Sequence, residues 1–292
     1  MADAKSPAVQ PASRSPVKFN PAAATRTPAR TIDVAALMPQ QEPDPPIETG
    51  VDLSGQTKII FAAGRGKTGK TTLLRWLTET ALAKGSSVLL ADIDPSNASF
   101  STYFTDVARP DTDNAAGVTT WLQQLLEHCV AEQQSAIVDL GGGDTTLRAL
   151  ATEMPDLANQ LEAAGIAPVM FYLLGTQPED VTPALTLASR GFMPTAQALV
   201  LNEVSVQAGQ TRRNAFARMI DSPGFQRVAR TSIQLWMPKL FAADAIEIRQ
   251  CRFHDAMAGH TTPELGIFDH ARLRTWLAQM DQRFSGVASW IP

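Results

Sequence analysis

One short loop constrains the fold of this chain more than any other feature. Residues Gly64-Arg-Gly-Lys-Thr-Gly-Lys-Thr71 match the pattern G-x-x-x-x-G-K-[ST], in which main-chain amides surround a phosphate group. The apolar run 58–63 before the loop predicts a strand, and recurring leucines over 71–84 predict a helix after it. This order matters because the N-terminus of the following helix adds positive potential. The pattern therefore predicts a phosphate site at the carboxyl end of a buried strand.

Short apolar segments alternate with helical ones along the rest of the chain. Further strands are predicted at 87–91, 136–140, 169–174, 196–201 and 233–237. Helices are predicted at 118–134, 180–189, 212–220 and 242–251. Strands that are apolar throughout are typical of a parallel sheet covered on both faces. We therefore expect one α/β domain over residues 57–292, with a doubly wound, mostly parallel sheet flanked by helices, as in P-loop NTPases.

Residues 1–56 differ in composition from the rest. Nine of the 20 prolines of the chain lie between Pro7 and Pro46, and Phe19 is the one aromatic residue of the segment. Such a segment buries too little apolar surface to offset its ordering entropy, which predicts a disordered tail. Its first 30 residues are basic, so two alternatives stay open: a plain solvated tail, or contact with nucleic acid or anionic lipid.

The bulk composition excludes several classes of protein. A net charge of −4 argues against a uniformly basic surface for nucleic acid. Cys129 and Cys251 form no CxxC pair and the chain has four histidines, so neither a zinc site nor a disulfide framework is expected. A reducing, cytoplasmic location fits this cysteine usage. No apolar run reaches the length of a membrane-spanning helix.

The loop residues have distinct expected roles. Lys70 is expected to reach the β- and γ-phosphates, the Thr71 hydroxyl to bind Mg²⁺, and Thr72 to support the α-phosphate. The rest of the loop is expected to form the anion cradle, and comprises Gly64, Arg65, Gly66, Lys67, Thr68 and Gly69.

Aspartates follow two of the predicted strands. Asp92 and Asp94 end the strand at 87–91, and Asp139 ends the strand at 136–140. Carboxyl ends of parallel strands meet at one edge of a sheet, so these carboxylates should lie beside the loop. We expect Asp139 and Asp92 to serve the metal and Asp94 to orient the attacking water. The glycines 141–143 are consistent with a switch that senses the γ-phosphate, or with a plain flexible loop.

Together these residues resemble the ParA/MinD family of partitioning and positioning ATPases. The resemblance covers roughly residues 58–250 and rests on the loop 64–72, the Asp92-Ile-Asp-Pro95 element, the strand ending at Asp139, Val200-Leu-Asn202 and Met237-Pro238-Lys239. It implies ATP and Mg²⁺ as ligands, with Asn202 and the segment at Pro238 lining the adenine pocket. The stretch from Asp92 to Asn97 also looks like members encoded with plasmid stability and conjugal transfer systems.

The resemblance implies a mechanism that depends on dimerisation. Two subunits would close over two ATP molecules, and a signature lysine at the second loop position would reach the nucleotide of the partner. Hydrolysis would release this ATP-dependent homodimer. Such dimers often hold non-specific DNA or a membrane, sometimes on the nucleoid, and a partner or cargo protein commonly stimulates turnover.

The sequence departs from the family at the signature lysine. Arg65 occupies that position, and Lys67 stands where glycine is usual. Arginine can grip phosphate bidentately, so Arg65 is a candidate for the same catalytic role, beside Lys70 and Asp94. The alternatives are that Lys67 takes over, that Arg65 is a solvated loop charge, or that the cross-subunit contact is absent.

Several functions remain open at this point. The favoured one is a dimerising ATPase that positions or partitions cargo, such as plasmid DNA or a transfer or secretion apparatus. The alternatives are a nucleotide-gated binding module with little hydrolysis and a metabolic ATP-dependent synthetase on the same scaffold. The amphipathic segment 269–284 is expected to pack on the sheet rather than on a membrane. Arg212, Arg213 and Arg218 form either a DNA-binding face or a solvated helix face. Adenine over guanine rests on the resemblance, since no N-K-x-D motif follows Leu201.

Overall fold

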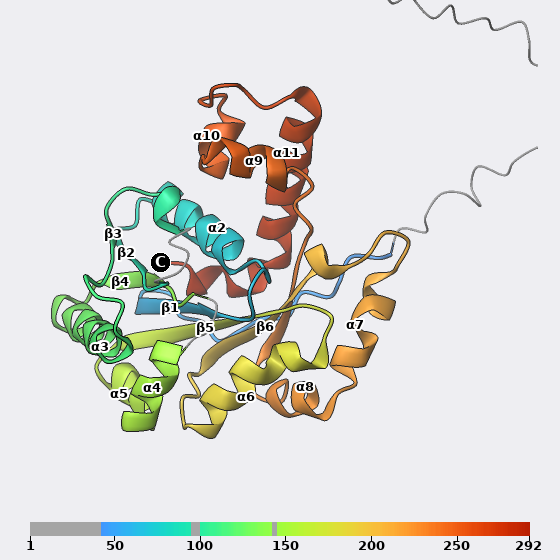
Figure 1. Ribbon diagram of the computed structural model, residues 1–292. Helices are drawn as coiled ribbons and strands as arrows, with labels where there is room; N and C mark the ends of the chain where they lie inside the picture. Colours follow the sequence, from blue (N-terminus) through green and yellow to red (C-terminus); the bar gives the residue numbers. More distant parts are fainter. Residues whose placement is uncertain (1–41, 95–99, 142–144) are drawn as a thin grey trace, which may run out of the picture. The chain divides into compact units, whose positions relative to one another are not determined.

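The computed structural model describes residues 42–94, 100–141 and 145–292, which belong to one unit that begins at Glu42. Within these ranges seven strands form one sheet, and every neighbouring pair is parallel (Figure 1). In chain order they are β1 (Thr57–Ala63), β2 (Val88–Asp92), β3 (Val107–Ala108), β4 (Ser135–Asp139), β5 (Ile166–Leu174), β6 (Ala196–Asn202) and β7 (Ile233–Met237). Across the sheet the order is β3-β2-β4-β1-β5-β6-β7. The predicted doubly wound α/β fold is confirmed.

Helices cover both faces of the sheet (Figure 1). One face carries α3 (Ala115–Glu132), α4 (Thr145–Glu153), α5 (Leu157–Ala163), α6 (Thr182–Ser189), α7 (Arg212–Ile220) and α8 (Pro223–Val228). The other carries α2 (Lys70–Ala83), α9 (Ala243–Arg249), α10 (Phe253–Met257) and α11 (Ile267–Arg283). Short 3₁₀ helices are η2 (Phe100–Thr102), η3 (Pro178–Val181), η4 (Glu203–Ser205) and η5 (Ser285–Trp290).

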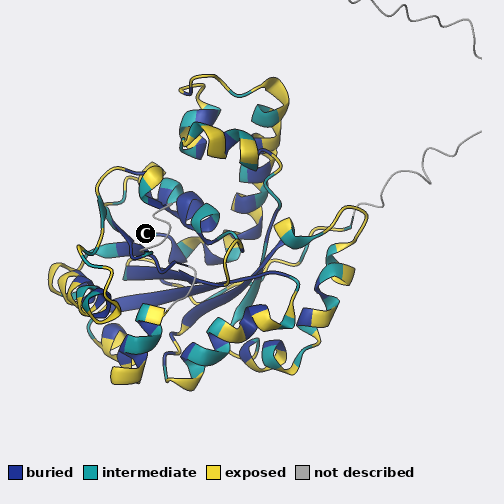
Figure 2. Cartoon of the chain, viewed as in Figure 1, coloured by how far each residue is buried: buried dark blue, intermediate teal, exposed yellow. Residues whose placement is uncertain are grey.

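Two hydrophobic cores follow from the pleat of the central strands. Along β1, Ile59 and Phe61 belong to the core under α3 to α8, whereas Ile60 and Ala62 belong to the core under α2 and α11. Figure 2 shows the strands as the buried centre between the helical layers. Because both faces are covered, the strands read as continuous apolar runs, which is why the sequence located them.

Helix α11 shows where the apolar face of the C-terminal segment goes. Leu273, Trp276 and Met280 are fully buried in the core beneath α2, so this face packs inside the domain as expected. No helix in the described part of the chain combines the length and apolarity that crossing a bilayer requires.

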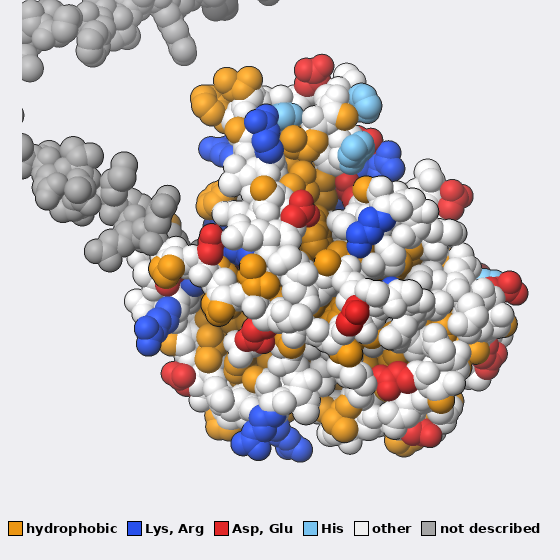
Figure 3. All heavy atoms as spheres, turned by 180° about the vertical axis from the view of Figure 1, so that it is seen from behind, with side chains coloured by type: hydrophobic (Ala, Val, Ile, Leu, Met, Phe, Trp, Pro, Cys, Tyr) orange, Lys and Arg blue, Asp and Glu red, His pale blue; other side chains and the backbone are white. Residues whose placement is uncertain are grey.

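A lobe made of α9, α10 and the first turns of α11 stands above α2 (Figure 1). The contacts of α10 with both α11 and α2 hold it there. Hydrophobic side chains are visible on the outside of this lobe when the domain is seen from behind (Figure 3). Strongly exposed hydrophobic residues in or next to its helices are Phe241, Ile248, Ile267 and Phe268.

Residues 42–56, here called the N-terminal strap, lie within the predicted tail but pack on the domain. The Gly50 amide donates to Gly286 O at 3.0 Å, and the Trp290 indole donates to Val51 O at 2.7 Å. Leu53 is buried beside them in the core beneath α2. The strap therefore joins the C-terminal segment before the chain enters β1. Residues 1–41, which make up the rest of the predicted tail, lie outside the described residues.

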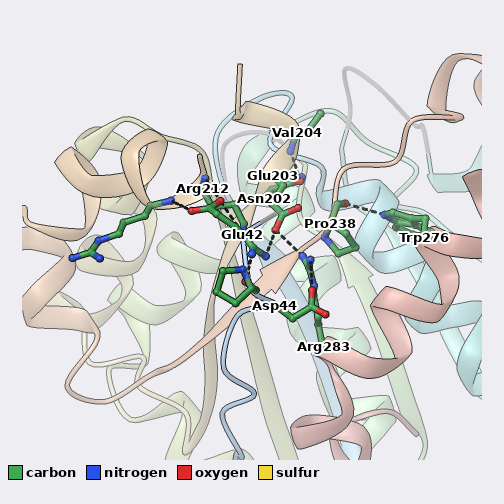
Figure 4. A network of polar contacts seen from close by, with 11 residues as sticks. Glu42, Asp44, Asn202, Glu203, Val204, Arg212, Pro238, Trp276 and Arg283 are labelled. Carbon is green, nitrogen blue, oxygen red and sulfur yellow. Dashed lines mark hydrogen bonds and ion pairs between the residues drawn. The ribbon is translucent and has the colours of Figure 1, made fainter. Parts of the chain in front are cut away.

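Charged residues fasten the start of the strap (Figure 4). The Glu42 carboxylate accepts from the Arg212 amide at 2.6 Å, at the N-terminus of α7 where a negative charge is favourable. Glu203 binds the guanidinium groups of Arg212 and Arg283, at 3.0 and 2.6 Å, and Arg283 also binds Asp44 at 3.3 Å. Arg212 is thus engaged in ion pairs with Glu42 and Glu203.

Candidate functional site

At two positions of the loop between β1 and α2, the backbone adopts a conformation that favours glycine. Gly64 and Gly69 have φ angles of 156° and 93°. A Cβ on Gly69 would lie 2.3 Å from Asn202 Nδ2, and one on Gly64 would lie 2.6 Å from Leu173 O. Lys67 is also left-handed, with φ at 64°, at the position where the family usually has glycine. The loop is therefore wound tightly against β5 and β6.

The Lys70 amine lies over this loop. The side chain is buried, with 7% exposure, and Nζ donates to Gly64 O at 3.1 Å and Arg65 O at 3.3 Å. It is the first residue of α2, so the helix N-terminus and the ammonium group act on the same volume. This combination binds a polyphosphate.

The strand register brings the acidic residues to the loop. Asp139 pairs with Ala62 on β1 and with Asp92 on β2, at the carboxyl ends of the three strands. The Thr71 hydroxyl donates to Asp139 Oδ2 at 3.3 Å. The loop and the Asp139 carboxylate are therefore in contact.

The two strand-end aspartates are buried together. Burial, with the neighbouring Asp139 charge, raises the pKa of Asp92 to about 6, and burial also raises the pKa of Asp139. Asp92 accepts the amides of Asp94 and Ser101 at 3.1 and 3.3 Å, and Asp139 accepts that of Gly141 at 3.0 Å. A nearby cation would lower both pKa values.

The donor set fits Mg²⁺ held jointly with a nucleotide. Residues 42–94, 100–141 and 145–292 contain no group of three or more His, Cys, Asp or Glu side chains that could hold a metal ion by itself. Mg²⁺ commonly takes one or two protein oxygens, with phosphate oxygens and water completing its octahedron. Thr71 and Asp139 would hold such an ion. Asp92 does not line the cavity, and both of its carboxylate oxygens already accept hydrogen bonds from main-chain amides, so it would support Asp139 rather than bind the ion.

A cavity of about 590 Å³ opens above these groups. The predicted residues that line it are Gly66, Lys67, Gly69, Lys70, Thr71, Thr72, Asp94, Asp139, Asn202 and Pro238. The predicted residues that do not line it are Gly64, Arg65, Thr68 and Asp92. Gly64, Thr68 and Asp92 support lining residues from behind, whereas Arg65 turns away.

Arg65 lies on the other side of the loop. Its guanidinium binds the buried Asp180 carboxylate at 3.3 Å, and its side chain is 56% exposed. Together with Lys67, Gly175 and Ser205 it lines a separate hollow of about 290 Å³. Within one chain, therefore, Arg65 does not share the cavity of Lys70 and Thr71.

Asn202 fixes the loop from β6 (Figure 4). Its side-chain amide donates to Thr68 O at 2.8 Å and its carbonyl oxygen accepts the Val204 amide at 3.0 Å. Pro238, the other residue expected beside the base, lines the cavity, and its carbonyl accepts the Trp276 indole at 2.9 Å. Both residues line the cavity, with their polar groups engaged in the protein.

The structure adds three polar residues that the sequence analysis missed. Arg75, Tyr103 and Glu247 line the cavity beyond the phosphate loop. Arg75 is 3% exposed, with its guanidinium 3.5 Å from the Tyr103 ring centroid and 4.2 Å from that of Phe253. One feature of the sequence could have indicated Arg75: it is a cation four residues after Thr71, and it therefore lies on the same face of the helix.

Comparison with known proteins gives structural neighbours only. No protein-family model matches the chain, and no curated protein matches it. Among solved structures, the cell division protein FtsY of Thermotoga maritima is similar at 13% identity and a TM-score of 0.41, over 66% of each chain. Chloroplast FtsY of Physcomitrella patens gives 15% and 0.42, over 65% of this chain and 62% of that one.

A third neighbour is the signal recognition particle receptor FtsY of Elizabethkingia anophelis, described in complex with GDP. It gives 14% identity and a TM-score of 0.41, over 65% of this chain and 59% of that one. The chain thus spans between 59% and 66% of the length of these proteins. The strand order, the phosphate loop and the strand-end carboxylates are typical of P-loop NTPases, and the chain has the α/β fold of these proteins.

Proposed function

We propose that the chain is a Mg²⁺-dependent ATPase that dimerises on ATP and positions or partitions a cargo, such as plasmid DNA or a transfer or secretion apparatus. One observation carries the ATPase part of this proposal. The Thr71 hydroxyl meets the Asp139 carboxylate at 3.3 Å beside the Lys70 amine, so a metal-binding group and a phosphate-binding group share one cavity.

ATP rather than GTP is favoured by the sequence after β6. A guanine-reading N-K-x-D motif starting at Asn202 would need lysine at 203 and aspartate at 205, and the chain has Glu203 and Ser205. Asn202 itself is committed to Thr68 O and Val204 N. The apolar side chains of Met237 and Leu240 leave a wall suited to a purine ring.

Asp94 is the candidate for orienting the attacking water. It lines the cavity beside Asp139, and Gly141 lies so close that a Cβ there would come within 2.8 Å of Asp94 Cγ. A carboxylate in this place can accept a hydrogen bond from water aimed at the γ-phosphorus, while the bound Mg²⁺ would neutralise phosphate charge. The bond to the β-phosphate oxygen then breaks, giving ADP and phosphate.

The dimer is inferred from the resemblance and from the exposure of Arg65. Its guanidinium is on the surface next to the loop, outside the cavity of its own chain, and would be free to reach a partner's nucleotide once it leaves Asp180. Lys67 borders both hollows and is the alternative cation. Cargo, stimulating partner, DNA and nucleoid association, and a cytoplasmic location belong to the same proposal.

A second candidate is a nucleotide-gated binding module with little hydrolysis. The Arg65–Asp180 ion pair favours it, because an arginine held within its own chain contributes no charge to a transition state in the partner.

Sedimentation velocity of the full chain separates these functions. With Mg²⁺ and ATP the chain should sediment as a dimer, and with ADP as a monomer. Added DNA should co-sediment with the ATP form alone if DNA is the cargo. Lys70→Ala should stay monomeric throughout. An ATP-stable dimer without phosphate release supports the binding module, and a monomer under all conditions contradicts the dimerising switch.

A further inference from the structure

The distal half of the cavity offers few side chains that can read a base. Beyond the phosphate loop its lining is largely apolar, with Val204, Met237, Pro238, Leu240, Ala243 and Ile246. Asn202 already uses both ends of its amide, on Thr68 O and Val204 N. The polar side chains left on this wall, within the described residues, are Arg75, Tyr103 and Glu247.

Arg75 is a buried cation held in a fixed orientation. The rings of Tyr103 and Phe253 lie over its guanidinium, and one terminal nitrogen donates to Cys251 O at 2.6 Å. Its Nε is buried and has no hydrogen-bonding partner among the described residues. Because Arg75 also lines the cavity, it presents a cation of fixed orientation to whatever occupies the cavity.

Glu247 reaches the same part of the cavity from the opposite wall. Ala243, Ile246 and Glu247 occupy one face of α9, at the i, i+3 and i+4 positions, and this face roofs the cavity. Glu247 is exposed, and its negative charge interacts with the Arg75 guanidinium. A fixed donor on α2 and a carboxylate acceptor on α9 thus border one space.

We propose that Glu247 and Arg75 read the purine base, with the Glu247 carboxylate accepting from the exocyclic amino group of adenine and Arg75 donating to a ring nitrogen. With the base held so that its position 6 faces Glu247, guanine would present a carbonyl oxygen there in place of the amino group, and the carboxylate repels that oxygen. The compensating contact for guanine, a bidentate arginine, needs two accessible donors on one edge. Arg75 has one nitrogen committed to Cys251 O and Nε buried.

This inference rests on the proposed ATP site, and a specificity ratio tests it separately. The affinities of the full chain for ATP and GTP are measured with Mg²⁺ by competition against a fluorescent nucleotide. Glu247→Gln should reduce the preference for ATP by about ten-fold, because an amide can serve adenine as acceptor and guanine as donor. Asp244→Asn is the matched control, since Asp244 is an exposed carboxylate of α9 outside the cavity lining, and should leave the ratio unchanged.

The outcomes separate the two proposals. A chain that binds neither nucleotide contradicts the proposed function. If the chain binds ATP, and Glu247→Gln either keeps the ratio within about two-fold or weakens both nucleotides equally, the base-reading role is overturned while the ATP site stands. A parent chain that prefers GTP overturns adenine selection by this pair.

Discussion

The two ends of the cavity are built by different means. At the phosphate end, a wound loop, a helix N-terminus and adjacent strand ends place Lys70, Thr71 and Asp139, so the main chain sets the geometry. At the distal end, Arg75, Tyr103 and Glu247 come from α2, from the residue after η2 and from α9, and side-chain packing sets their positions. We therefore expect substitutions at the phosphate end to weaken nucleotide binding itself. Substitutions at the distal end should change the preference between nucleotides and weaken the packing of the lobe on α2.

Lys70→Ala should give the largest effect and sets the scale of the comparison. Removing the ammonium group from the phosphates should weaken ATP binding about 100-fold or more, since charge-assisted hydrogen bonds to phosphate are lost. Isothermal titration with Mg²⁺ measures this. Lys84→Ala, at the far end of α2, is the control and should bind as the parent does. Retained micromolar affinity in Lys70→Ala would show that the loop is not the nucleotide site.

Gly69→Ala tests whether main-chain geometry governs the phosphate end. The new methyl group would lie 2.3 Å from Asn202 Nδ2 at a φ of 93°, so the bond from Asn202 to Thr68 should break. We expect ATP affinity to fall about ten-fold and the free energy of unfolding to fall by about 1 to 3 kcal/mol. Gly85→Ala is the matched control, because its φ of 78° is also positive, a Cβ there meets nothing within 4 Å, and it lies outside the cavity lining. Equal effects of both substitutions would refute the role assigned to the close approach.

Glu79→Ala probes the distal end through the lobe. The Glu79 carboxylate accepts the amides of Phe253 and His254 at 2.8 and 2.7 Å and so ties α10 to α2. Its loss should lower the free energy of unfolding by about 1 to 3 kcal/mol, because the amides of Phe253 and His254 lose their acceptor. Urea unfolding, with the exposed Glu132→Ala as reference, measures the change. If the affinity of Glu79→Ala for pyrophosphate stays as in the parent, the distal end of the cavity is independent of the phosphate end.

The smallest effect is a pH dependence at the phosphate end. Because the pKa of Asp92 is raised to about 6 in the fold, its protonated form is favoured there. Protonated Asp92 therefore stabilises the folded state. This stabilisation is complete below the ordinary pKa of the carboxyl, near 4, and is lost as pH rises through about 6. Without nucleotide or Mg²⁺, Asp92→Asn should therefore gain stability relative to the parent over this window, on the order of 1 to 2 kcal/mol. A difference between the two proteins that stays constant from pH 4 to 7 would contradict the assigned burial.

Sequence patterns locate the phosphate end because its chemistry is local. A loop between a strand and a helix, and aspartates at strand ends, are visible as consecutive residues, and the parallel sheet then brings them together. Short elements such as β3, with two residues, and α10, with five, carry no period long enough to detect. Arg75 and Glu247 meet only through the packing of α9 and α10 on α2, which no local pattern encodes.

The N-terminal strap is a second region whose contacts the sequence does not predict. Its proline-rich composition predicts disorder, yet Glu42 and Asp44 are bound by arginines 170 and 239 residues away. Composition measures how much apolar surface a segment can bury, and this segment is held instead by charges and main-chain bonds to a surface formed elsewhere. The ion pair of Arg65 is likewise not predicted by local sequence, because its partner Asp180 is 115 residues further along the chain.

The way the strap is fastened has a mechanical consequence. A force applied to the chain at Glu42 is resisted first by ion pairs with Arg212, and next by the hydrogen bond from the Gln234 amide of β7 to the Glu48 carboxylate. Hydrogen bonds from Gly50 and to Val51, which anchor on residues 286 and 290, resist it after that. Salt would weaken the outer ion pairs and leave the inner main-chain bonds in place, so the strap would loosen stepwise from its outer end.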